Sequence, residues 1–119
     1  MTPAEELRQI LASYAPLTAL CGDRIRVDLA REEDDYPFIV FKRVSFQRIT
    51  GLDGSVHARR DTFQVECWAG SRAASSALAE LADEALRAGE LDPDESDPDS
   101  IDPEIGARAV VLNVDMWSD

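Results

Sequence analysis

The segment from Asp92 to Asp97 has the residue types and spacing that come nearest to a metal-binding motif. Its D-x-D-x-S opening matches the first three ligand positions of an EF-hand calcium loop. The match then ends, because Asp97 replaces the turn glycine and Pro103 replaces the bidentate glutamate. A solvated acidic loop therefore accounts for this segment better than a calcium site, with a loosely bound divalent cation as the alternative. We expect no resident metal and no cofactor.

The chain has few residues arranged for catalysis. His57 is its only histidine and lies among turn residues, close to two arginines. The sequence contains no G-x-S-x-G nucleophile elbow, no G-x-x-x-x-G-K phosphate loop and no dinucleotide-binding fingerprint. Carboxylates are numerous, but their number follows from an acidic composition. We therefore expect a protein that is not an enzyme.

The net charge of −12 over 119 residues narrows the classes of partner. A chain with so few cations cannot displace the counterions of a DNA backbone, and anionic membranes repel it. No apolar run approaches the roughly 20 residues of a membrane helix, and the first residues lack the regions of a signal peptide. Cys21 and Cys67 are isolated, which indicates buried thiols rather than a zinc site. We expect a soluble, cytosolic chain with one domain over residues 1–119.

The first part of the chain predicts a helix followed by a short strand. Thr2 and Glu5 form a capping box around Pro3, which suits the first helical position. An apolar stripe follows at helical spacing, and Pro16 ends or kinks the helix before one further short turn. Residues 25–29 then alternate between apolar and charged side chains, as in a half-buried strand. The apolar stripe consists of Leu7, Ile10, Leu11 and Tyr14.

Residues 38–69 predict one long β-hairpin. Pro37 precedes an apolar run whose start we expect to be covered on both faces. The alternation after this run places Val44 and Phe46 toward the core. Residues 50–55 have the composition of a turn, with two glycines available for positive φ. The apolar residues of the return strand share one face: Phe63, Val65 and Cys67.

A second helix, an acidic segment and a last strand complete the pattern. Ser71 is a suitable N-cap, an Ala- and Leu-rich stripe follows, and Gly89 stands where a C-cap glycine belongs. Residues 90–104 hold eight carboxylates, three prolines and no basic residue, so we expect an extended or disordered loop. Alternation over residues 110–116 predicts the final strand. The fold class is therefore α+β, a mainly antiparallel sheet of about four strands with two helices on one face, in the order α-β-β-β-α-β.

Basic residues gather in the hairpin, against the acidic sign of the chain. An exposed hairpin with solubilising charge is one interpretation. The other is a self-association surface, in which this basic hairpin meets an acidic surface on a neighbouring copy. Segregated charges of this kind suit a ring, in which the front of each copy meets the back of the next. The candidate interface residues are Arg43, Arg48, Leu52, Arg59 and Arg60.

Taken in order and with these spacings, the segments resemble the phage tail completion or tail terminator proteins of long-tailed phages. The similarity extends over nearly the whole chain, although no single motif is specific. The acidic insertion at residues 90–104 is longer and more charged than is usual for that family. The matching segments are the N-terminal helix, residues 17–25 and 36–41, the strand ending at residues 65–69 with the helix directly after it, and the closing strand with Asp115, Met116 and Trp117.

The resemblance implies a structural virion protein at the head–tail junction, assembled in the cytoplasm of a bacterial host. It implies a six-fold ring that caps the head-proximal end of the tail tube, stops tube polymerisation and presents a docking surface to the head connector. The implied partners are further copies of the chain, the tail tube protein and the connector, with DNA as passing cargo and no membrane. A negative wall keeps passing DNA from adhering, so we expect the acidic loop to face the channel. The candidate channel-facing carboxylates are Asp92, Asp94, Glu95, Asp97, Asp99, Asp102 and Glu104.

The sequence is also compatible with two other functions. One is a different neck component, such as a head–tail joining or adaptor protein, which contacts the portal or connector rather than the tube. The other is an acidic mimic of DNA that inhibits a nucleic-acid enzyme, and the net charge of −12 motivates it. Against the mimic, the carboxylates are bunched in one loop rather than spaced like phosphates.

Overall fold

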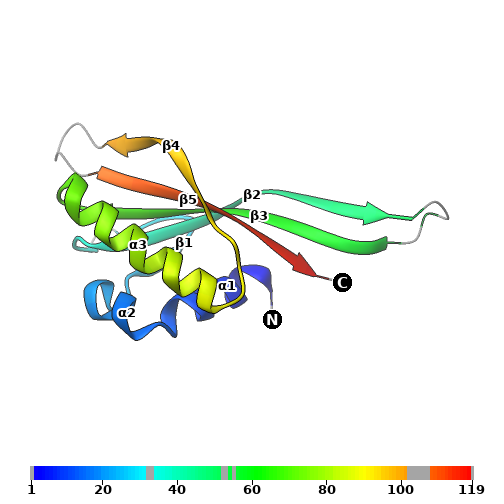
Figure 1. The fold of residues 1–119 in the computed structure, drawn as a ribbon, viewed down its shortest axis with the longest axis horizontal. Coiled ribbons are helices and arrows are strands. Elements are labelled where there is room, and N and C mark those ends of the chain that lie inside the picture. Colours follow the sequence, from blue (N-terminus) through cyan, green and yellow to red (C-terminus); the bar gives the residue numbers. More distant parts are fainter. Residues whose placement is uncertain (1, 32–33, 52–53, 55, 102–107, 119) are drawn as a thin grey trace.

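The chain folds into a twisted sheet with its helices on one face (Figure 1). The computed structural model describes residues 2–31, 34–51, 54, 56–101 and 108–118. The helices are α1 (Pro3–Ala12), α2 (Ala15–Cys21) and α3 (Arg72–Ala88). The strands are β1 (Ile25–Val27), β2 (Phe38–Thr50), β3 (Val56–Ala69), β4 (Asp94–Ile101) and β5 (Arg108–Ser118). Within these ranges, no helix is both long and apolar enough to span a membrane.

The sheet has the strand order β1-β2-β3-β5-β4. β1 pairs with β2 in parallel, and all the other neighbours pair antiparallel. The predicted α+β class and the long hairpin over residues 38–69 are therefore confirmed, with a sheet that is mixed rather than purely antiparallel. α2 is a separate short helix, and β4 adds a strand at the edge of the sheet.

The core lies between the sheet and the helices. Phe41 and Phe63, on neighbouring strands, are among its largest fully buried side chains and meet edge to face with ring centroids 6.2 Å apart. Burying each large apolar side chain contributes roughly 1.5–3 kcal/mol, so these contacts carry much of the stability. The helices cover this layer with Leu7, Leu11, Leu17, Leu78, Ala82, Ala85 and Leu86.

The end of α3 differs in detail from the predicted glycine cap. Gly89 is the C-cap but has φ −87°, and the residue in the left-handed region is Glu90, with φ 66°. The amide of Glu90 donates to the carbonyl of Arg87 (3.0 Å), and that of Leu91 donates to the carbonyl of Leu86 (2.9 Å). These two bonds form a Schellman motif. Glycine at position 89 instead permits close packing, because an added Cβ would lie 2.7 Å from the Cγ2 atom of Ile10.

Strand β4 replaces the loop expected over part of residues 90–104. It pairs antiparallel with the first half of β5, whose backbone supplies hydrogen-bond partners that local sequence reasoning omits. The register is interrupted between Ser96 and Ser100, around Pro98. A proline is tolerated there because β4 is an edge strand. The expectation for residues 102–104 lies outside the described residues.

The hairpin of β2 and β3 extends beyond the layer of helices (Figure 1). The molecule measures 53 × 29 × 23 Å, and its radius of gyration is 15.1 Å. A compact domain of this length has a radius of gyration of about 13.5 Å, so the projection elongates the molecule. Val44 and Phe46 lie on this projection and are 47% and 50% exposed, so the prediction that they face the core is wrong. A register shift between Arg43 and Ser45 changes the alternation at that point.

Candidate assembly interface

The projecting part of the hairpin is the most distinctive surface of the molecule. We call it the arm and define it as residues 43–50 of β2 and 56–61 of β3. The two strands stay paired along it, so the sheet continues past the helices as a ribbon (Figure 1). The first residues of α1 line a cavity of about 310 Å³ together with Arg43, Asp61 and Phe63, which marks the base of the arm.

The helix-side face of the arm is organised around Asp61, a carboxylate that is only 1% exposed. Arg59 donates two hydrogen bonds to it, from Nε to Oδ1 (2.7 Å) and from Nη2 to Oδ2 (3.1 Å). Arg43 adds a longer contact from Nη1 to Oδ2 (3.4 Å). The guanidinium carbons of Arg43 and Arg59 also lie 5.0 Å and 4.8 Å from the ring centre of Phe46. Asp61 therefore fixes two arginines, and these flank a half-exposed aromatic ring.

This arrangement has the chemistry of a protein interface. Arginine and aromatic side chains are enriched where protein surfaces bind tightly, and they dominate the energetic hot spots. Each cation–π contact at an exposed site contributes roughly 0.5–1 kcal/mol, and the bonds to Asp61 hold the guanidiniums in place. Side chains held before binding lose less entropy when a partner arrives. The arm thus presents a preorganised surface.

The opposite face of the arm carries a second pair of the same kind. The guanidinium of Arg60 lies 5.6 Å from the ring centre of Trp117, which belongs to the end of β5 and is 61% exposed. The Nη2 atom of Arg60 also donates to the side-chain oxygen of Gln47 (2.9 Å). Its Nε atom is buried and has no hydrogen-bond partner among the described residues. On each face of the arm, therefore, an exposed aromatic ring lies beside one of its arginines: Phe46 of the arm itself on one face and Trp117 of the adjacent β5 on the other.

The structure brings most of the predicted interface residues together on the arm. Arg48 is exposed and pairs in register with Arg59, whereas Leu52 lies outside the described residues. Sequence reasoning missed Phe46, Trp117 and Asp61. The available signal was length, because a 13-residue strand spans about 43 Å and a 17-residue helix only about 26 Å. The helix cannot cover the whole strand, so apolar residues near its far end are exposed.

Comparison with known protein families identifies the family to which this chain belongs. Residues 5–119 match the model of a family described as tail completion protein gp17. The chain belongs to this family. No curated protein matches the sequence. Membership makes the chain a structural component of phage tails that interacts with other tail components, which confirms the resemblance drawn from the sequence.

Part of the acidic segment of this tail completion chain forms β4, the edge strand of the sheet opposite β1. Asp92 is exposed and accepts a hydrogen bond from Nη1 of Arg87 (3.1 Å), so this carboxylate is compensated. Asp94 is exposed at the start of β4. The backbones of Glu95, Asp97 and Asp99 belong to β4, and Asp102 and Glu104 lie outside the described residues. Over the described part of the chain, no cluster of three His, Cys, Asp or Glu side chains is placed to hold a metal ion.

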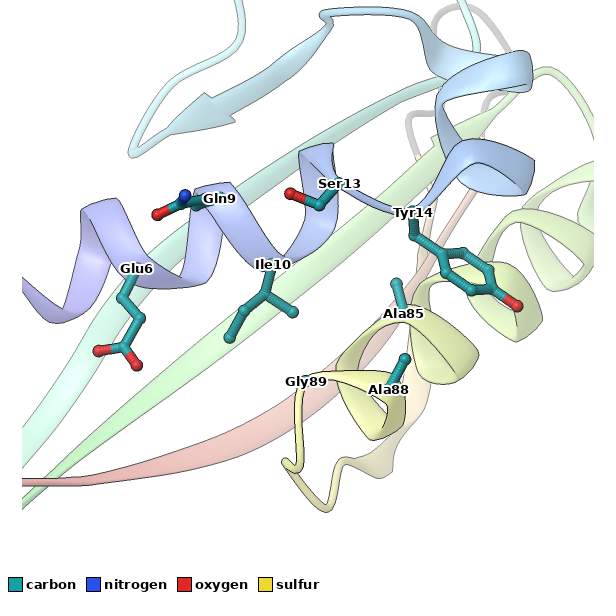
Figure 2. Close-up of a pocket in the computed structure, with 8 residues that line it drawn as sticks. All are labelled: Glu6, Gln9, Ile10, Ser13, Tyr14, Ala85, Ala88 and Gly89. Atoms are coloured by element: carbon teal, nitrogen blue, oxygen red, sulfur yellow. The ribbon is translucent and has the colours of Figure 1, made fainter.

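A groove between α1 and the end of α3 is the second notable surface. It has a volume of about 250 Å³ and is lined by Ile10, Ala85, Ala88 and Gly89, with Glu6, Gln9, Ser13 and Tyr14 around them (Figure 2). Ile10 of α1 and Tyr14, the N-cap residue of α2, extend toward α3, and Ala85 and Ala88 face them (Figure 2). The hydroxyl of Tyr14 donates to Oε2 of Glu84 on α3 (3.0 Å). The groove therefore combines an apolar floor with acidic side chains at its margin.

Proposed function

We propose that copies of this chain form a six-fold ring that caps the head-proximal end of the tail tube. The ring ends polymerisation of the tube and provides the surface to which the head connector docks. The observation that carries the proposal is the arm, an exposed ribbon with arginine–aromatic pairs on both faces. Family membership makes the chain a component of a phage tail. The arm provides a surface through which this component can contact another.

The distribution of charge on the chain supports assembly through two different surfaces, the arm of one copy and the body of the next. Four of the 12 basic residues of the chain, Arg43, Arg48, Arg59 and Arg60, lie on the arm, while the chain as a whole has a net charge of −12. A basic arm on one copy is attracted to the acidic body of another, and this attraction accelerates encounter and selects the register. Because arm and body are different surfaces, the contact repeats from copy to copy and closes into a ring when the rotation permits.

We also propose that the acidic segment from Asp92 to Glu104 lines the channel or its rim. Passing DNA carries one negative charge per about 1.7 Å of its axis, and a negative wall repels it. This repulsion keeps the duplex from adhering during its passage. The segment would then serve transport and take no part in sequence recognition.

The test is the growth of tail tubes in vitro with and without the purified chain. Addition of the chain should shorten tubes and leave it bound at one end, as seen by electron microscopy with labelled protein. Phe46→Ala combined with Trp117→Ala should lose this effect, because the variant removes the two exposed aromatic rings that lie beside arginines of the arm. Leu29→Ala, which truncates an exposed apolar side chain outside the arm, is the matched control and should act like the parent. Unchanged tube length with the parent chain would contradict the proposal, and binding to the connector alone would favour an adaptor.

A further inference from the structure

We infer that the groove between α1 and α3 receives the arm of a second copy of this chain. The inference rests on the proposed ring and names the surface on each copy that holds its neighbour. The arm and the groove match in polarity, in size and in charge.

The match in polarity and size concerns Phe46. Its ring is half-exposed and contacts the guanidiniums of Arg43 and Arg59, which Asp61 holds in place, so it can serve as an anchor. The floor of the groove is apolar, with Ile10 on α1 and Ala88 on α3 facing each other (Figure 2). A cavity of about 150 Å³ is known to hold a benzene ring. The groove, at about 250 Å³, has room for the phenyl group of Phe46 and part of its neighbours.

The match in charge concerns the margins of both surfaces. Glu6 lines the groove, and Glu84 is held beside it by the hydroxyl of Tyr14. Arg87, the basic residue near the end of α3, is neutralised by bonds to Asp83 (3.0 Å) and Asp92 (3.1 Å). The margin of the groove is therefore negative. On the arm, the register places three arginines, Arg43, Arg48 and Arg59, on the same face as Phe46. Asp61 contributes one negative charge to this face, so its net charge is positive.

The arm of one copy cannot fill the groove of the same copy. The arm continues β2 and β3, which stay paired on both sides of the register shift at its base, and it points away from the helices (Figure 1). The occupant is therefore another molecule, and charge complementarity within one sequence selects a second copy. Each copy offers one arm and one groove, which is the head-to-tail contact that a closed ring requires.

Disulfide trapping tests the contact directly. The variant Arg48→Cys carries a thiol on the groove-facing side of the arm, and the variant Gln9→Cys carries one at the margin of the groove. Mixed and oxidised under assembly conditions with tail tubes present, the two single variants should give a covalent dimer, and the double variant a ladder of higher multiples. Gln47→Cys mixed with Gln9→Cys is the matched control. Position 47 faces the other side of the same strand, where Gln47 bonds to Arg60, so this mixture should give no covalent dimer.

Filling the groove provides a second, independent measurement. Ala88 is exposed on the folded monomer, so Ala88→Phe should leave the fold intact while its ring occupies the groove. Native mass spectrometry should show assembly weakened roughly thirtyfold, the effect of losing one aromatic anchor. Ala12→Phe, at an exposed position of α1 outside the groove lining, should assemble like the parent.

The outcomes separate this inference from the proposed ring. A ring that forms on tubes without the cross-link, and that tolerates Ala88→Phe, overturns the groove as receptor and leaves the ring standing. A cross-link from Arg48→Cys to the tube protein instead of Gln9→Cys also overturns it, since the arm then binds the tube. If the parent chain assembles neither alone nor on tubes, the ring and the groove contact both fail.

Discussion

Arg59 and Asp61 lie two residues apart on β3, and their side chains are joined by two hydrogen bonds of 2.7 Å and 3.1 Å. Alternate residues of a strand share a face, so this pairing is local to β3. It places a buried carboxylate under the guanidiniums that flank Phe46. The exposed arm is thus held in shape by a charge that solvent scarcely reaches, and this dependence can be measured.

Removal of the carboxylate should destabilise the chain and its assembly together. In Asp61→Ala, Arg43 and Arg59 lose their acceptor at the base of the arm, which should cost about 1–3 kcal/mol of the free energy of unfolding. Urea denaturation measures this cost. Asp115→Ala is the matched control, because Asp115 is an exposed carboxylate that accepts a hydrogen bond from Thr62 (2.7 Å), and it should change stability by less than about 0.5 kcal/mol. Equal stability of both variants would show that Asp61 does not organise the arm.

The end of α3 should respond in opposite directions to two neighbouring substitutions. Gly89→Ala places a Cβ against Ile10 and should lower the free energy of unfolding by about 1–2 kcal/mol, with most of the loss recovered in an Ile10→Ala background. Glu90→Gly should raise it by about 0.5–1 kcal/mol, because glycine adopts the left-handed conformation without steric cost. Thermal and urea unfolding measure both. A stabilising Gly89→Ala would refute the close-packing role assigned to that glycine.

Low pH should reduce the free energy of unfolding in part through protonation of Asp34. Arg26 donates hydrogen bonds to its two carboxylate oxygens (2.9 Å and 3.1 Å), and these bonds hold the pKa of Asp34 below its ordinary value. The unfolded state then binds a proton more readily than the folded state. The stabilisation is therefore complete above the unfolded pKa of about 4 and is lost as the pH falls through the lower folded pKa. The loss of stability between about pH 6 and pH 3 should be smaller in Asp34→Asn than in the parent, and identical pH profiles would contradict this assignment.

The two thiols should be inert in the folded chain. Cys21 and Cys67 are free and buried, and burial raises the pKa of both. The thiolate is the form that reacts with alkylating reagents. Folding therefore slows alkylation in two ways: it shields the sulfur atoms from the reagent, and it lowers the fraction of thiolate. Iodoacetamide at about pH 8 should label neither cysteine in the native chain and both after denaturation, as counted by mass spectrometry. Rapid native labelling at either position would show that the core around it opens.

Local patterns predicted those elements whose signals are strong along the chain. The N-cap at Thr2 is observed, with its side-chain oxygen accepting from the amide of Glu5 (3.1 Å), and the Glu5 carboxylate accepts in return from the Thr2 hydroxyl (3.2 Å). The N-cap at Ser71 is observed too, accepting from the amide of Ala74 (3.2 Å). The alternation in β5 also places Leu112 and Val114 in the core. Each of these features depends on residues within a few positions of one another.

The missed features depend on what lies beside a segment in space. Phe46 has the alternation of a buried residue, and only the length of the hairpin relative to the helices leaves it exposed. Asp94 starts a strand because β5 offers hydrogen-bond partners far away in sequence. Gly89 resembles an ordinary C-cap glycine, yet its absent side chain serves the approach of Ile10 from α1. Tertiary context decides all three, and neighbouring residues do not reveal it.

The most direct test of the account is electron cryomicroscopy of tail tubes grown in the presence of the purified chain. We predict additional density at one end of each tube only, with six copies of the chain arranged around an open channel and tubes that no longer elongate. Tubes with bare ends and unchanged growth, or copies of the chain distributed along the tube wall, would contradict the proposal that this protein terminates the tail.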